Sequence, residues 1–421
     1  MNKYVAIDLG SSRISAMIAE VQNDGALKIL AVESKAADDV KHGIVEQVSG
    51  AAFKVNEVVK LAQNSARIIE DIEQIAVSVN GRSMKSHPVT VNRFVDASKI
   101  VSEQLLGEML EEAGNKVKGE NIAVYDVIPV SYELDGVKHD DPVGQKGTQI
   151  SGKYTIIYGS ALIEHGVERC FDRTGLKVEH TVTAIEALST AVLEEEERET
   201  GCALINFGAS TTTLGIYNKG SLQKLIVSPL GGKNITRDIM ELGISEEHAE
   251  KIKCLRGSAL VSMIDNPVLI QIPSVIPDSK PVKISTEFLA TIIEARLDEI
   301  TQPLFNAIKN FPDRLEGGII ITGGGARVKN IIEYINERTG TYARTGHHTD
   351  WLSDTNNPVF LDPILSQLAG TILLTDEYRK LHPKEEEKKK KIKEPKIPKK
   401  GIKERITKSL FNFFGDDNEM N

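Results

Sequence analysis

Two short segments of the chain, about 200 residues apart, carry residues that could hold a phosphate group. They read VAIDLGSSR at residues 5–13 and LINFGASTT at residues 204–212. In both, an apolar run ends in an acid or its amide, Asp8 or Asn206, and glycine and small or hydroxyl residues follow. A strand that ends in such a turn exposes consecutive backbone N–H groups that can surround a phosphate. A carboxylate at the end of the strand, such as that of Asp8, can orient the water molecules on a bound Mg²⁺ ion.

The number and order of these turns are more informative than either turn alone. A single glycine- and serine-rich turn after a strand fits an ordinary β-hairpin equally well. Here two such turns open two halves of one chain, and a third glycine turn lies in GGIIITGGGARVKN at residues 317–330. The pattern predicts a duplicated fold that grips one nucleotide from both sides.

The regular elements around these turns indicate an α/β protein with an insertion. Residues 1–32 predict three strands, with a hairpin turn at Asn-Asp-Gly, and residues 51–66 have the periodicity of a helix. Residues 83–164 break this rhythm with further strand patterns, one helix and a glycine-rich loop, which predicts a small inserted α+β subdomain. The expected division is a first half at 1–82 and 165–201, the insertion at 83–164, a second half at 202–228 and 316–378, and a smaller subdomain of that half at 229–315.

Composition excludes several classes of protein. The 421 residues are 40% hydrophobic and 26% charged, which is ordinary for a globular chain. The three cysteines are well separated and form no C-x-x-C pair, which argues against a disulfide framework or a zinc site. The start of the chain lacks a signal-peptide pattern, and no segment approaches the roughly 18 to 20 apolar residues of a membrane-spanning helix. These features predict a cytoplasmic protein.

Charge divides the chain into an acidic body and a basic C-terminal segment. Residues 379–408 hold 14 Lys and Arg against five Glu, although the net charge of the whole chain is −9. We therefore expect no nucleic-acid partner for the body. Residues 379–400 contain proline and charge blocks with little to bury, which predicts a disordered linker.

The segment at 401–414 regains helical spacing and carries an amphipathic pattern. Its apolar stripe consists of Ile402, Ile406, Leu410, Phe413 and Phe414. Such a helix is too short to span a bilayer and suits the membrane interface, where the preceding lysines would attract anionic lipid. The alternative is a helix that docks on the body of the protein or on a partner.

Several longer segments together match one known family. AIDLGSSR, TAIEALSTAVLEEEERETG and ITGGGARVKNI occur in the order of the first phosphate motif, the connecting helix and the adenosine motif of the actin-like ATPase superfamily, which they resemble. SPLGGKNITRDI, EEHAEKIKCLRGSAL and VYDVIPVSYELDG with DPVG are similar to segments of the FtsA family of bacterial cell-division proteins within that superfamily. The resemblance covers roughly residues 1–380 and the C-terminal helix. It implies a duplicated actin-like, ribonuclease H-like fold with an inserted α+β subdomain.

The resemblance also implies roles for individual residues in binding ATP and Mg²⁺. Asp8 and Asn206 would approach Mg²⁺ through water, and Glu186 would lie near the attacking water. The residues expected to hold the nucleotide are Asp8, Gly10, Ser11, Ser12, Arg13, Gly208, Ala209, Ser210, Thr211, Glu250, Lys253, Gly324, Gly325 and Ala326. Glu250 and Lys253 would contact ribose and adenine, although a solvated helix face is the other reading of this pair. Glu186 could equally be a surface acid on an amphipathic helix.

The second turn departs from the family pattern of Asp, an apolar residue, three glycines and Thr. Asn206 keeps the size and hydrogen bonding of aspartate but lacks the charge that helps to hold a metal and polarise water. Ala209 and Ser210 add side-chain carbons where the backbone must come close to a phosphate. The departures predict ATP binding with slow or negligible hydrolysis.

The function implied by the resemblance is that of a membrane-tethered, ATP-binding actin homologue at the division septum. Its partners would be the FtsZ C-terminal peptide, further copies of itself in a filament, anionic lipid of the cytoplasmic membrane and other cell-division proteins. Arg296, on a predicted helix, is the candidate contact for the FtsZ peptide, and pairing with neighbouring acids is its alternative role. The other functions considered are a soluble sugar or acetate kinase, and a pilus-assembly actin homologue that shares the inserted subdomain. Asn206 and the C-terminal amphipathic helix argue against the kinase.

Overall fold

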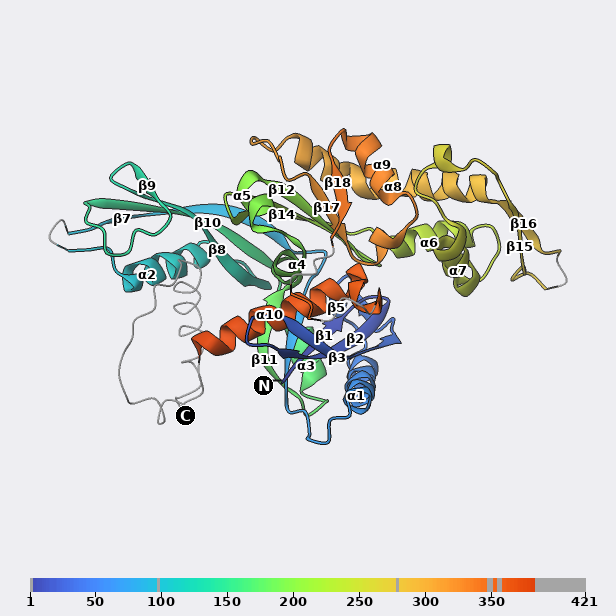
Figure 1. Cartoon of the computed structure of the whole chain (residues 1–421), viewed down its shortest axis with the longest axis horizontal. Coiled ribbons are helices and arrows are strands. Elements are labelled where there is room, and N and C mark those ends of the chain that lie inside the picture. Colours follow the sequence, from blue (N-terminus) through green and yellow to red (C-terminus); the bar gives the residue numbers. More distant parts are fainter. Residues whose placement is uncertain (1–2, 97–98, 278–279, 347–350, 354–357, 383–421) are drawn as a thin grey trace.

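The structure is a computed structural model that describes residues 3–96, 99–277, 280–346, 351–353 and 358–382. The molecule is elongated, with two central halves and a smaller body at each end (Figure 1). The predicted membrane helix at 401–414, with Ile402, Ile406, Leu410, Phe413 and Phe414, and most of the predicted linker at 379–400 lie outside the described residues. Among the residues described, none of the helices has the length and apolar character needed to cross a membrane.

The first half is built on a five-stranded sheet with the order β11-β6-β1-β2-β3. Strands β1, β2 and β3 form an antiparallel meander, and β6 and β11 join it in parallel on the side of β1. The strands are β1 (Lys3–Leu9), β2 (Arg13–Val21), β3 (Leu27–Ala36), β6 (Gln74–Val79) and β11 (Lys177–Thr183). The tight turn between β1 and β2 therefore lies at the centre of the sheet, where β1 ends.

The second half repeats this arrangement with the order β14-β13-β12-β17-β18. Again three antiparallel strands are followed by two parallel ones on the side of the first strand. The strands are β12 (Cys202–Phe207), β13 (Thr212–Asn218), β14 (Ser221–Ser228), β17 (Ile319–Thr322) and β18 (Ala343–Thr345). The predicted duplicated α/β fold is confirmed by this shared topology.

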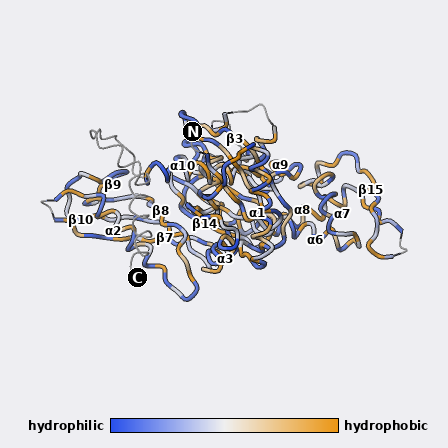
Figure 2. Tube along the Cα trace, turned by 90° about the horizontal axis from the view of Figure 1, so that it is seen from below, coloured by the Kyte–Doolittle hydropathy of each residue, from blue (hydrophilic) through white to orange (hydrophobic). Residues whose placement is uncertain are grey.

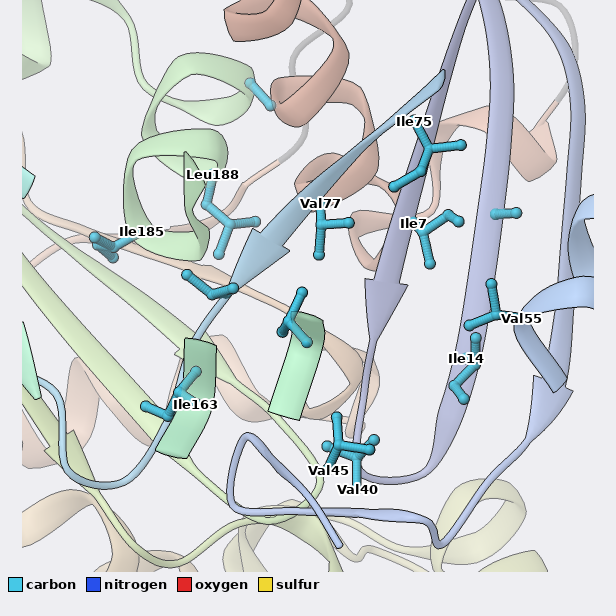
Figure 3. Packing of buried hydrophobic residues seen from close by; sticks show 14 of the residues in the cluster. Ile7, Ile14, Val40, Val45, Val55, Ile75, Val77, Ile163, Ile185 and Leu188 are labelled. Carbon is cyan, nitrogen blue, oxygen red and sulfur yellow. The ribbon is translucent and has the colours of Figure 1, made fainter. Parts of the chain in front are cut away.

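Both faces of the first sheet are covered, which explains the nearly continuous apolar runs in its central strands. On one face, Ile7, Ile14, Ile75 and Val77 pack with Val55 of α1 (Val48–Ser65) in one cluster (Figure 3). On the other face, Tyr4, Ala6 and Met17 pack against α10 (Ser366–Leu381). The hydropathy-coloured trace shows apolar segments concentrated in the central body (Figure 2).

Two helices cross where the halves meet. They are α4 (Ala184–Val192), which precedes β12, and α10, which follows β18. A side-chain carbon added at Gly370 of α10 would overlap the carbonyl oxygen of Ala187 in α4. The crossing is thus as close as two helix backbones allow, and it fixes the start of α10 between the two sheets.

The inserted subdomain lies at one end of the molecule (Figure 1). Its sheet has the order β7-β10-β8-β9, with α2 packed against it. The elements are β7 (Lys85–Phe94), α2 (Glu103–Gly114), β8 (Ile122–Leu134), β9 (Val137–His139) and β10 (Gln149–Ser160). The hydroxyl of Ser102 caps α2 by accepting a hydrogen bond from the Leu105 amide. The subdomain contacts the second half through Ser86, whose Oγ accepts from the Leu225 amide of β14.

The opposite end of the molecule belongs to the second half and carries a helical layer and a two-stranded ribbon (Figure 1). Helix α8 is the longest helix of this layer, and its buried side chains pack with those of α6 and α7 in one core. The elements here are α6 (Gly232–Met240), α7 (Glu246–Arg256), β15 (Leu269–Ile272), β16 (Val282–Ser285) and α8 (Thr286–Lys309). The remaining short elements are β4 (Val40–Lys41), β5 (Ile44–Val45), α3 (Leu162–Phe171), α5 (Glu195–Thr200) and α9 (Ile331–Thr339).

Candidate nucleotide site

A cavity of about 880 Å³ lies between the two halves. Its walls come from the β1–β2 and β12–β13 turns, the glycine turn after β17, the first residues of α6, one side of α7 and the start of α10. Every segment that the sequence suggested for phosphate or nucleotide contact reaches this cavity. A cavity of this size is in the range of small-molecule and cofactor sites.

The two hairpin turns are geometric copies of one another. In each, four residues separate a paired couple, Leu9 with Ile14 and Phe207 with Thr212. A side-chain carbon on Gly10 would lie 2.7 Å from the carbonyl oxygen of Arg13, and one on Gly208 would lie 2.8 Å from that of Thr211. Glycine is therefore required at the same point of both turns, because no larger residue fits beneath the returning backbone.

The two turns face each other across the cavity. Ser210 Oγ donates a hydrogen bond of 2.7 Å to Ser11 Oγ. The same Ser210 hydroxyl accepts from the His42 amide at 3.2 Å, and His42 Nδ1 lies 3.0 Å from the Ser210 carbonyl oxygen. Hydroxyl groups and backbone from both halves thus converge on one point, as a phosphate shared between two loops requires.

The start of α6 supports the second turn from behind. The amides of Gly232 and Lys233 donate to the carbonyl oxygens of Gly208 and Ala209, at 3.0 and 2.8 Å. A side-chain carbon on Gly231 would lie 2.6 Å from the Gly208 carbonyl oxygen, so the helix can approach only because that residue is glycine. These contacts satisfy the carbonyl groups of the turn.

Asp8 is the penultimate residue of β1, and its partly buried carboxyl group lies at the cavity. Gln367 Nε2 donates to Asp8 Oδ1 at 2.9 Å. Burial raises the pKa of Asp8 to about 6, and the Arg13 charge and the Gln367 hydrogen bond oppose that rise only in part. Burial likewise lowers the pKa of the Arg13 guanidinium, although the carboxylates of Asp8 and Asp362 favour its charged form. A cation near Asp8 would stabilise its ionised form further.

Asn206 occupies in β12 the place of Asp8 in β1, and the third glycine turn packs directly on it. Gly323 has a φ of +83°, and a side-chain carbon there would lie 2.5 Å from Asn206 Oδ1. A side-chain carbon on Gly325 would overlap the ring of the buried Phe207. The turn after β17 can thus lie on the end of β12 only because these positions are glycine.

Glu250 and Lys253 form a hydrogen-bonded network on the α7 wall of the cavity. Lys253 Nζ donates to Glu250 Oε2 at 2.6 Å, to Thr236 Oγ1 at 2.8 Å and to the Gly232 carbonyl at 3.1 Å. Burial would raise the pKa of Glu250, but the Lys253 charge and hydrogen bonds from Lys253 and Thr236 outweigh it and lower that pKa. Lys253 is only 9% exposed, whereas 49% of the Glu250 side chain is exposed, so a buried lysine fixes a partly solvated carboxylate on this wall.

Comparison with known proteins shows which family the chain is similar to. Residues 203–364 match the family model described as "Cell division protein FtsA". The FtsA protein of Borreliella burgdorferi is 29% identical over 392 residues, which cover 90% of this chain and 92% of that protein. The FtsA protein of Pseudomonas aeruginosa is 26% identical over 378 residues, which cover 88% of each chain.

The chain is therefore similar to FtsA proteins over most of its length. Solved structures agree on the fold. A PilM–PilN type IV pilus biogenesis complex has a TM-score of 0.62 at 15% identity, covering 88% of this chain and 98% of that chain. MreB5 of Spiroplasma citri bound to ADP has a TM-score of 0.56 at 14% identity, covering 91% and 99%. At these identities the likeness concerns the actin-like fold alone.

Two residues that the FtsA resemblance singled out do not line the cavity. Glu186, on α4, accepts a hydrogen bond of 3.0 Å from the Tyr217 hydroxyl, and its charge acts on Asp126 of the inserted subdomain. Ala326 is buried beneath the third glycine turn. All other residues predicted to hold nucleotide or metal line the cavity: Asp8, Gly10, Ser11, Ser12, Arg13, Asn206, Gly208, Ala209, Ser210, Thr211, Glu250, Lys253, Gly324 and Gly325.

Arg296, the candidate FtsZ contact, is engaged within the α6–α8 layer. Its Nε and Nη2 donate to the two carboxylate oxygens of Asp238 at 2.5 and 2.7 Å, and its Nη1 donates to Glu299. The hydrogen bond to Asp238, together with the charges of both acids, raises the pKa of Arg296. The Arg296 guanidinium thus forms a bidentate ion pair with Asp238 at the surface of the layer.

Sequence reasoning did not single out several residues that line the cavity. Lys233 at the start of α6, Arg327 after the third glycine turn and Gln367 at the start of α10 are among them. The GGK run before an amphipathic segment could have indicated Lys233, because glycines at a helix start often approach an anion. Nothing in the local sequence marks Gln367, whose place depends on the crossing of α10 with α4. Within the described ranges, no group of three or more His, Cys, Asp and Glu residues could hold a metal ion directly.

Proposed function

We propose that this protein is a member of the FtsA family that binds ATP between its halves, assembles into filaments and anchors FtsZ to the cytoplasmic membrane at the division septum. The observation that carries the proposal is the meeting of two equivalent glycine turns, joined from Ser210 to Ser11, at one cavity. Solved actin-like structures of MreB5 with ADP and with AMPPNP show that proteins of this fold bind adenine nucleotides.

The chemistry of the walls supports a nucleotide laid along the cavity. The backbone amides of residues 10–13 and 208–211, with Ser11, Ser12 and Ser210, would hold the terminal phosphates. Glu250 offers an acceptor toward the ribose, and Lys253 could donate to the nucleotide by exchanging one of its bonds to Glu250, Thr236 or Gly232. Gly324 and Gly325, followed by Ala326, would form the backbone surface against which the nucleotide lies.

The residues around Asp8 fit a water-coordinated Mg²⁺ ion. The Asp8 carboxyl is partly buried, and a divalent cation would favour the ionised form that burial opposes. Mg²⁺ usually keeps several waters, which Asp8 and Asn206 could orient through hydrogen bonds. When bound, the ion would neutralise charge on the phosphate oxygens.

The same geometry favours an assembly protein with slow or negligible hydrolysis over an efficient enzyme. Asn206 supplies no charge at the second strand end. Glu186 accepts a hydrogen bond from Tyr217 and does not line the cavity, so its carboxylate is engaged elsewhere. Occupancy of the cleft by ATP can still bias conformation and assembly without turnover.

Membrane attachment is assigned to the C-terminal segment on its sequence. Residues 379–400 are basic, and the stripe from Ile402 to Phe414 would lie in the lipid interface. Helix α10 extends to Leu381, three residues into the segment expected as a linker, so the tether would start from a helix packed on the first half.

FtsZ binding is assigned to the α6–α8 layer at 229–315. Arg296 could pair with a carboxylate of the FtsZ C-terminal peptide only by exchanging its bond to Asp238 or Glu299. We expect such an exchange at the surface, where one carboxylate replaces another at little cost.

The test is a co-pelleting assay with the full chain and vesicles containing anionic lipid. ATP with Mg²⁺ should increase the pelleted fraction, and FtsZ should pellet only when this protein is present. When the chain lacks residues 401–421, both proteins should stay in the supernatant while the vesicles pellet. Undiminished lipid binding by that chain would refute the tether, and the absence of ATP binding by the full chain would refute the nucleotide site.

A further inference from the structure

Gln367 is the polar side chain that the crossing helices contribute to the phosphate end of the cavity. It is the second residue of α10, and its Nε2 donates to Asp8 Oδ1 and to Ser78 Oγ, both at 2.9 Å. Ser78 is 4% exposed and lies directly opposite Asp8 in the parallel pairing of β6 with β1. The sheet therefore fixes the spacing of both acceptors, and one amide group bridges them.

This bridge determines which carboxylate oxygen of Asp8 could contact a hydrated cation. Oδ1 is occupied by the Gln367 amide. Oδ2 is turned toward the first turn, since a side-chain carbon on Gly10 would lie 3.4 Å from it. Because rotation about the last side-chain bond of aspartate is soft, a hydrogen bond to one oxygen sets the direction of the other.

The element that carries Gln367 is held rigidly. Gly370, one turn further along α10, lies against the Ala187 carbonyl, and Asp376 accepts a hydrogen bond of 2.6 Å from Tyr4 of β1. A residue on such a helix can place an amide within the tolerance that a bound ion demands. Glu186 on the other crossing helix has no such role, since its carboxylate is directed to Tyr217.

The second half supplies no carboxylate at the strand position equivalent to that of Asp8. Asn206 stands where that half would supply its own strand-end carboxylate, so Asp8 is the one charged group of the pair. The orientation of a single carboxylate then determines whether a hydrated cation is well held.

We propose that Gln367 is a positioning residue that aims the Asp8 carboxylate at the Mg²⁺ ion accompanying the nucleotide. This rests on the proposed function, because it presupposes ATP with Mg²⁺ in the cleft. The role acts through Asp8, so it concerns the coupling between Mg²⁺ and nucleotide and leaves the other nucleotide contacts intact.

The experiment measures the affinity of the full chain for ATP by calorimetry, with Mg²⁺ and with EDTA. The ratio of the two affinities reports the coupling. In Gln367→Met, which keeps the length of the side chain and removes the donor, we expect this ratio to fall about tenfold, the size of a lost hydrogen bond to a charged group. Affinity in EDTA should stay within about twofold of the parent chain.

Gln223→Met is the matched control. Gln223, on β14, also donates two hydrogen bonds through its amide, to the carbonyl oxygens of Asn218 and Ser221, and it does not line the cavity. We expect this variant to keep the parent ratio. A second variant, Gln367→Asn, keeps an amide but is one methylene too short to reach Asp8, so it should behave as Gln367→Met does.

The outcomes separate the two proposals. A parent chain that binds ATP more tightly with Mg²⁺, and a Gln367→Met variant that keeps the full ratio, would overturn the role of Gln367 alone. Equal losses with Mg²⁺ and with EDTA, or unfolding of both Gln367 variants while Gln223→Met stays folded, would make Gln367 a structural residue and also overturn it. A parent chain that binds no ATP in either condition would instead overturn the proposed function.

Discussion

Ser210 donates a hydrogen bond of 2.7 Å to Ser11, and this contact joins the two glycine turns of a duplicated fold across the cleft between them. The residues are 199 positions apart in sequence. Each follows a strand that occupies the same place in its own sheet. The hydroxyl pair thus marks the point where a phosphate held by both halves would enter.

We expect this contact to be replaced when ATP binds. In the nucleotide-free protein, Ser11→Ala and Ser210→Ala should be coupled in a double-mutant cycle of unfolding free energy by about 1 kcal/mol, the usual net value of such a bond. At saturating ATP the coupling energy should fall toward zero, because a phosphate oxygen would take both hydroxyl groups as partners. Chemical denaturation of the four proteins, with and without ATP, measures both values. The same coupling in both conditions would contradict a phosphate between the turns.

Gly324 allows stability and nucleotide binding to be separated. A side-chain carbon there would meet only Ile364 Cδ1, at an ordinary 3.8 Å, so Gly324→Ala should leave the melting temperature nearly unchanged. The added methyl would stand in the cavity, where the nucleotide is proposed to lie on the backbone, and ATP affinity should fall at least about tenfold.

Gly208→Ala is the contrasting variant. Its side-chain carbon would lie 2.8 Å from the Thr211 carbonyl, so it should destabilise the fold by about 1 kcal/mol or more. Thermal unfolding and ATP titration of the two variants give four numbers. Unchanged ATP affinity in Gly324→Ala would remove this turn from the site.

The repeat of the glycine turn allowed the duplicated fold to be predicted, because a strand that ends in Gly and Ser has a local signature. The strand patterns predicted within residues 83–164 likewise correspond to strands of the structure, such as β8 (Ile122–Leu134). Strand β11 (Lys177–Thr183) was not predicted, since its polar residues Lys177, Glu179 and His180 hide a strand whose place depends on parallel pairing with β6. Local pattern carries short-range geometry, and parallel pairing between distant segments leaves little trace in it.

The candidate site divides in the same way. Residues in the turns could be predicted because their chemistry belongs to the turn itself. Gln367 could not, since its contact with Asp8 exists only after α10 has crossed α4. Glu186 fails to reach the cavity for a tertiary reason as well, because the Tyr217 hydroxyl holds its carboxylate.

Asn206→Asp should raise the rate of ATP hydrolysis. The substitution keeps the shape of the side chain next to Gly323 and adds the charge that the family pattern has at this position. A second carboxylate would help to hold the cation and polarise the attacking water, so we expect an increase of about tenfold or more in phosphate release. Asp8→Ala combined with Asn206→Asp is the control and should abolish the gain. A rate equal to that of the parent chain would show that Asn206 is not the limiting departure.

Asp126 should make stability depend on pH at the junction of the inserted subdomain with the body. Burial, followed by the negative charge of Glu186, raises the pKa of Asp126 to about 7 from an ordinary value of 3.8. A raised carboxyl pKa contributes stability that is fully present below about pH 4 and is lost as pH rises through about 7, since the folded protein must then bury a charged group. Asp126→Asn retains an acceptor for the Val127 amide and carries no charge. Relative to the parent chain, this variant should therefore gain about 4 kcal/mol between about pH 4 and pH 8, because the pKa differs by about three units at about 1.4 kcal/mol each; denaturant unfolding measures this gain. Glu186→Gln should reduce the pH dependence of the parent chain, and an Asp126→Asn difference that is constant with pH would contradict the assignment.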